Sequence, residues 1–187
     1  MKFEELIHSI ESTHLQLSAQ AVKQVNYLQT IRNWLIGCYI VEFEQNGEDR
    51  AVYGKNPIPP LAHRLKQMGI IGMGQRNLYT FKEFYICYPQ ILQTVSAKFK
   101  STLIGDFSNK IEVVNDELML PIETLINTLS FSHFIELLRL DSDIKRRFYE
   151  IETVKNAWKV RELARAIDTL LFERTGLSTD KKGIKKS

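Results

Sequence analysis

Cysteine is scarce in this chain, and two cysteines in 187 residues exclude a disulfide framework. Cys38 and Cys87 lack the paired spacing of a zinc site and fall in apolar helical patterns, so we expect reduced, buried thiols. The longest apolar run, 34–41, is far shorter than the roughly 20 residues that span a bilayer. Residues 1–11 lack the apolar block of a signal peptide. These absences favour a cytoplasmic protein that does not enter a membrane.

The residue patterns of common catalytic sites are also missing. The four histidines, at 8, 14, 63 and 133, show no metal-ligand spacing. The glycines of 69–74 have neither a preceding strand nor the lysine-serine ending of a phosphate loop. No nucleophile elbow or Cys/His pair is present. We therefore expect no catalytic, metal or cofactor site, and we interpret this chain as a non-enzyme.

What the sequence does contain is apolar spacing typical of helices, which predicts an all-α fold. The expected helices run over 3–10, 15–45, 57–68, 75–88, 90–99, 121–129, 132–140, 141–156 and 160–175, with a break at Ser12 or Thr13. Residues 101–120 are either a polar connection or a small β-hairpin. We group these elements into one helical domain over 1–178, made of long N-terminal helices (1–50), a helix-turn-helix-like segment (51–100) and a C-terminal helical segment (121–178). Residues 179–187 are expected to be a disordered tail or a linker.

The expected helix over 15–45 would be about 47 Å long, more than a small domain needs. Gly37 lies inside it, where glycine costs about 1 kcal/mol relative to alanine, so we expect a close helix crossing there. The excess length predicts a homodimer in which Leu28, Leu35 or their apolar neighbours form the interface.

Positive charge is concentrated in one segment. Residues 55–100 hold seven Lys or Arg against one acid, a net +6, and the next segment, 101–137, holds one cation against six acids, a net −5. Such asymmetry suggests a polyanionic partner. Two helices joined by a short glycine-containing turn within the basic segment are typical of a helix-turn-helix.

We expect the second of these helices to bind nucleic acid through its outer face. With Leu78, Phe81 and Tyr85 turned inward, helical geometry leaves the polar side chains nearer solvent. The candidate contacts on this helix are Gln75, Arg76, Tyr79 and Lys82. Arg and Gln near a helix N-terminus can reach base edges, and Lys can hold a phosphate. The alternative is a basic face that contacts only solvent, because such a face would show the same residue spacing.

A second basic cluster, Arg161 and Arg165, lies one helical turn apart in the last expected helix. Leu163, Ile167 and Leu170 would form the opposite, apolar face. We include both arginines as candidate nucleic-acid contacts. Because acids are mixed among them, an ordinary soluble surface explains the same pattern.

Several short stretches stand in order along 31–177, namely Trp34–Gly37, Tyr53–Lys55, Gln75–Leu78, Phe84–Tyr85, Leu129–His133, Phe148–Tyr149, Trp158–Leu163 and Ile167–Arg174. Together they resemble the N-terminal domain of the YhcG-like family of proteins assigned as nucleases. The chain departs from the family pattern at Gly74, where a capping serine is usual, and at Lys159, where Ser or Thr is usual.

Family members resemble two-part proteins, in which a helical N-terminal domain precedes a PD-(D/E)xK nuclease domain. The chain ends where that nuclease domain would begin, so the resemblance implies a targeting or assembly domain and carries over no catalytic residue. Our interpretation is a DNA-binding targeting module for a C-terminal nuclease domain. The alternative is an assembly module in which the N-terminal helix and the regions of Trp34 and Trp158 form a homodimer or bind a partner subunit.

Overall fold

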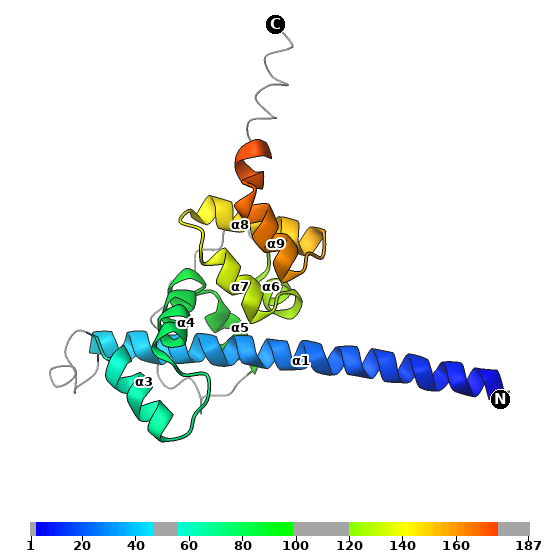
Figure 1. Ribbon diagram of the computed structural model, residues 1–187, viewed down its shortest axis with the longest axis horizontal. Coiled ribbons are helices and arrows are strands. Elements are labelled where there is room, and N and C mark those ends of the chain that lie inside the picture. The colour runs from blue at the N-terminus through cyan, green and yellow to red at the C-terminus, as the bar shows by residue number, and fades with distance from the viewer. Residues whose placement is uncertain (1–2, 47–55, 99–119, 176–187) are drawn as a thin grey trace, which may run out of the picture.

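The computed structural model describes residues 3–46, 56–98 and 120–175, and all regular elements among them are helices (Figure 1). The predicted all-α fold is confirmed. The possible β-hairpin at 101–120 lies outside the described residues except for residue 120. The tail at 179–187 lies wholly outside them.

One long helix, α1 (Phe3–Asn46), lies between α3 (Ile58–Gln67) on one side and α6–α9 (122–168) on the other (Figure 1). Its 44 residues correspond to about 66 Å at 1.5 Å per residue. The predicted break at Ser12 or Thr13 is wrong. Serine can remain in a helix by bonding back to the preceding turn, as the Ser9 hydroxyl does by donating to the Glu5 carbonyl (2.8 Å). Among the described residues, no helix is both long and apolar enough to cross a membrane.

The next three helices are α3 (Ile58–Gln67), α4 (Gln75–Cys87) and α5 (Ile91–Lys98). Each lies within a few residues of its predicted position. Proline in the first turn starts α3, because its missing N–H has no partner to lose there. Helix α4 ends at Cys87, just before Pro89 and one residue short of the end of the expected helix over 75–88.

The C-terminal part contains α6 (Ile122–Thr128), α7 (Phe131–Leu137), α8 (Asp143–Lys155) and α9 (Val160–Asp168). The expected helix over 160–175 is interrupted, because Leu170 takes a left-handed backbone conformation (φ 53°) before a last helical turn at 171–175. Leu170 is therefore 57% exposed, and its assignment to the inner apolar face was wrong.

Two apolar clusters hold these helices together. The larger joins α1 to α4–α9 around fully buried Trp34, whose indole N–H donates to the Tyr88 carbonyl (2.8 Å). The smaller joins α1, α3 and α4 around Ile58 and Leu78. In the view of Figure 1, α3 lies on one side of α1 and α6–α9 on the other, while the N-terminal half of α1 extends away from both.

Candidate nucleic-acid interface

The position of α4 is set by its close crossing with α1. A Cβ added at Gly37 would lie well inside contact distance of the Phe81 carbonyl and 3.0 Å from the Tyr85 Cβ. The Trp34 and Tyr85 rings pack beside this point with centroids 5.1 Å apart. The predicted close crossing at Gly37 is therefore present, and it fixes which face of α4 is turned outward.

The connection from α3 to α4 depends on glycine at two positions. Gly69 (φ 73°) and Gly72 (φ 84°) both have left-handed backbone conformations, which side chains rarely allow. Gly69 follows the α3 C-cap, where backbone N–H groups return to the Arg64 and Lys66 carbonyls. The Asn77 amide then donates to the Gly72 carbonyl (2.9 Å) and ties the turn to the start of α4.

The first turn of α4 presents two predicted contacts to solvent. Gln75 and Arg76 are exposed, and Gly74 precedes them as the N-cap without a side-chain hydrogen bond. On the inner side of the helix, Leu78 and Phe84 are 0% exposed. The predicted division of α4 into an inner and an outer face is confirmed, with Phe84 buried more completely than half-buried Tyr85.

Lys82 and Tyr79 are less available than the sequence suggested. The Lys82 ammonium forms an ion pair with the Glu44 carboxylate of α1 (2.6 Å), and its side chain is 29% exposed. The Tyr79 hydroxyl accepts a hydrogen bond from the Asn56 amide (2.6 Å) just before α3. Both side chains thus connect α4 to its neighbours, so a ligand would have to compete for the Lys82 charge.

Sequence reasoning missed Lys66 as a member of this face. A hollow of about 460 Å³ lies between α3 and the turn, and His63, Lys66 and Gln75 are among its lining residues. Lys66 is exposed and stands on the last turn of α3. It was counted in the basic segment, but the signal that places it beside Gln75 is the reversal of the chain at Gly69 and Gly72. We call Lys66, Gln75 and Arg76 the α3–α4 face.

The second predicted pair is exposed on a different part of the molecule. Arg161 and Arg165 lie on the solvent side of α9, while Leu163 and Ile167 are buried beneath them. Helix α9 packs on α7 and α8, whereas α4 packs on α1 and α3, so the structure does not bring the two predicted clusters together. At the N-cap of α9, Lys159 stands where the family usually has Ser or Thr. There the Lys159 backbone N–H donates to the Glu162 carboxylate (2.7 Å).

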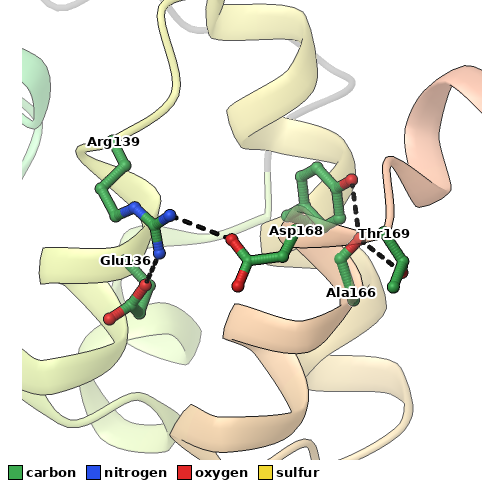
Figure 2. Close-up of polar contacts among 6 residues, drawn as sticks. Glu136, Arg139, Ala166, Asp168 and Thr169 are labelled. Atoms are coloured by element: carbon green, nitrogen blue, oxygen red, sulfur yellow. Dashed lines mark hydrogen bonds and ion pairs between the residues drawn. The ribbon is translucent and has the colours of Figure 1, made fainter.

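Polar contacts join α9 to α8 and to the segment just after α7 (Figure 2). The Arg139 guanidinium, just after α7, reaches both the Glu136 carboxylate (2.5 Å) and the Asp168 carboxylate of α9 (3.0 Å). The Tyr149 hydroxyl of α8 donates to the Ala166 carbonyl (3.3 Å). Arg139 is therefore a structural cation, unlike Arg161 and Arg165.

Burial shifts the pKa values of several titratable groups inside the helical domain. Desolvation raises the pKa of the Glu150 carboxyl to about 6, although the Tyr88 hydroxyl donates to it (2.6 Å) and favours its charged form. Burial lowers the pKa of His133, whose ring accepts from the Ser130 backbone N–H (3.1 Å) at the start of α7. Burial also raises the pKa of the Cys38 thiol to about 11. In the part of the chain that the structure describes, no three His, Cys, Asp or Glu residues gather as metal ligands.

Comparison with known proteins agrees with the resemblance found in the sequence. The chain is 34% identical over 178 residues to "Putative nuclease YhcG" of Escherichia coli (strain K12), a match that covers 94% of this chain and 46% of that protein. The chain thus spans about half the length of this curated relative. No solved structure matches significantly. The family model described as "DUF1016 N-terminal domain" matches residues 9–174. This chain therefore belongs to the DUF1016 N-terminal domain family.

Proposed function

We propose that this domain binds duplex DNA through the α3–α4 face and so positions a nuclease domain attached to its C-terminal side. The observation that carries the proposal is the exposure of Gln75 and Arg76 at the start of a helix whose opposite face is fully buried. A rigidly held helix start with free Gln and Arg side chains matches the chemistry of base and phosphate contacts. The name of the E. coli relative, a nuclease, supports a nucleic acid as the partner.

The cations on the α3–α4 face differ from Lys82, farther along α4, in whether an acid is paired with them. Lys66 and Arg76 are exposed, and neither forms an ion pair within the described residues. Lys82 is held by Glu44, so a phosphate would have to displace that carboxylate. We therefore assign phosphate contact first to Arg76 and Lys66, and to Lys82 only when its pairing with Glu44 is broken.

The proposal is tested by titrating a fluorescent duplex with this protein at several salt concentrations. Replacing Lys66 and Arg76 with Ala should weaken binding and lower the slope of log K against log salt by roughly 2, since each lost phosphate contact removes about 0.9. Both side chains are exposed, so the far-ultraviolet circular dichroism should not change.

Two further variants sharpen the test. Replacing Arg161 and Arg165 with Ala removes the same charge from exposed positions on α9 and should leave the affinity within about twofold. Glu44→Gln releases Lys82 and removes a negative charge beside the face, so it should raise the affinity and steepen the salt slope by about 0.9. Wild-type protein that shows no duplex binding at low salt would overturn the proposal. Equal losses in the two double variants would show that binding follows net charge and not the α3–α4 face.

A further inference from the structure

The N-terminal half of α1 carries apolar side chains that the described residues leave exposed. Between Phe3 and Val25 no side chain of α1 is buried, and burial begins at Tyr27. In Figure 1 this part of the helix projects away from the other helices. Even so, Phe3 is 73%, Ile10 61% and Leu17 60% exposed, which is unusual for a helix with solvent on every side.

These side chains follow one face of the helix. Phe3, Ile7, Ile10, Leu17, Val25 and Leu28 fall within an arc of about 80° at 3.6 residues per turn, and we call them the α1 stripe. Positions 3, 7, 10, 14, 17, 21, 24 and 28 alternate by four and three residues, which is the heptad spacing of helices that pack along their length. Trp34 and Val41, which face the core of this domain, project from a different side of α1.

We propose that the α1 stripe packs against the same stripe of a second copy of this chain, with the two helices antiparallel. The heptad positions are symmetric about a point between His14 and Leu17. An antiparallel pair therefore places Phe3 against the partner copy's Leu28 and Ile10 against its Ala21. Such a two-fold contact closes on itself and leaves the helical body of each copy at opposite ends.

Charge favours the antiparallel orientation. Residues 3–14 carry three glutamates and no Lys or Arg, a net −3, whereas residues 15–32 carry Lys23 and Arg32 and no acid, a net +2. An antiparallel pair sets the acidic end of one helix beside the basic end of the other. A parallel pair would place the glutamates of both copies at the same level, where they repel each other.

The area of the stripe suits a second copy of this chain. Six side chains that each retain roughly 100 Å² of exposed surface would bury about 1,200 Å² in total, the lower end of the range for specific interfaces. This inference does not depend on whether the α3–α4 face binds DNA.

Sedimentation velocity over roughly 1–100 µM tests the pairing, with wild type expected to form a dimer in that range. Ile10→Lys with Leu17→Lys puts charge on the stripe and should weaken the dimer at least 100-fold. The control is Leu15→Lys with Val22→Lys, whose wild-type side chains are 60% and 61% exposed on the same helix but lie about 110° around it from the stripe. The control should dimerise like wild type. Monomeric wild type, or equal behaviour of the two double variants, would refute the proposal.

Disulfide cross-linking tests the orientation separately. Phe3→Cys and Leu28→Cys proteins are mixed, oxidised and digested, and the linked peptides are identified by mass spectrometry, so that Cys38 and Cys87 do not confuse the result. An antiparallel pair yields a peptide that joins residues 3 and 28 in the mixture. A link between two copies of residue 3 in the Phe3→Cys protein alone would show a parallel pair and overturn the proposed arrangement.

Discussion

Replacing Gly37 with Ala should destabilise the domain even though alanine is the better helix former. Alanine gains about 1 kcal/mol of helix propensity within α1. This gain is opposed by a steric clash, because the new methyl group would overlap the Phe81 carbonyl. That carbonyl belongs to the backbone and cannot rotate away as a side chain could. Overpacking a closely packed interior commonly costs about 1–3 kcal/mol, and a backbone obstacle is at or above the upper end. We expect a net loss of about 2 kcal/mol.

The loss should appear in both urea and thermal unfolding. For a chain of this size about 2 kcal/mol lowers the midpoint temperature by roughly 4–8 °C. Gly74→Ala is the control for a methyl group added without a clash, because a Cβ there meets nothing within 4 Å, and it should cost no more than the roughly 1 kcal/mol by which alanine is the poorer N-cap. A Gly37→Ala protein as stable as wild type would show that Gly37 does not determine the spacing between α1 and α4.

The N-cap of α4 and the buried Glu150 carboxyl give two further predictions. Gly74→Ser supplies the side-chain acceptor that the α4 N-cap lacks, and it should stabilise the protein by a few tenths to about 1 kcal/mol in urea unfolding, while a loss of stability would contradict this reason. The folded-state pKa of Glu150, about 6, is raised from 4.5, so its contribution to stability is complete below pH 4.5 and is lost as the pH rises through 6. Glu150→Gln keeps an acceptor for the Tyr88 hydroxyl. The variant should be about 2 kcal/mol more stable than wild type at pH 8, and the two proteins should be equally stable near pH 4. A gain in stability that is the same at both pH values would exclude ionisation of Glu150 as its cause.

The helices could be predicted from the sequence because their signals are local. Proline at the start of α3, the glycines before α4 and Pro89 after it each act within a few residues, and the structure follows them closely. Local signals were insufficient where the same residues are compatible with two different local structures. Ser12 and Thr13 can cap a helix or remain inside one, and only the continuous α1 shows which occurs.

The candidate interface was predicted less completely because it depends on contacts between distant residues. The outward direction of Arg76 follows from helix periodicity, but the pairing of Lys82 with Glu44 joins residues 38 positions apart. Lys66 reaches the same hollow as Gln75 only because the chain reverses between α3 and α4. Periodicity assigns a face to a side chain and does not identify the partner that the face meets.

The predicted dimer interface shows the same limit. Leu28 and Leu35 are one heptad apart and share a face of α1, yet Leu28 is 45% exposed whereas Leu35 is 8% exposed within the core of this domain. The assignment of Leu35 to an intermolecular contact was therefore wrong. Trp34 is fully buried as well, so the assembly alternative cannot use it as an exposed contact. Where the core ends along α1 could only be seen in the structure.

The helical content of residues 3–25 provides a second test of whether two copies of α1 associate. An isolated helix of about 20 residues is marginal in water unless it is rich in alanine, and this one contains several Ser, Thr and His residues. None of residues 3–25 is buried against the described part of the chain, so a second copy should supply the support. Dilution of wild type through its dissociation range should then lower the far-ultraviolet helical signal by up to about a fifth, the share of residues 3–25 in the described helices. Ile10→Lys with Leu17→Lys should show the lower signal at every concentration. Full helicity in a monomeric protein would mean that residues 3–25 hold their helix alone, and the association argument would lose this support.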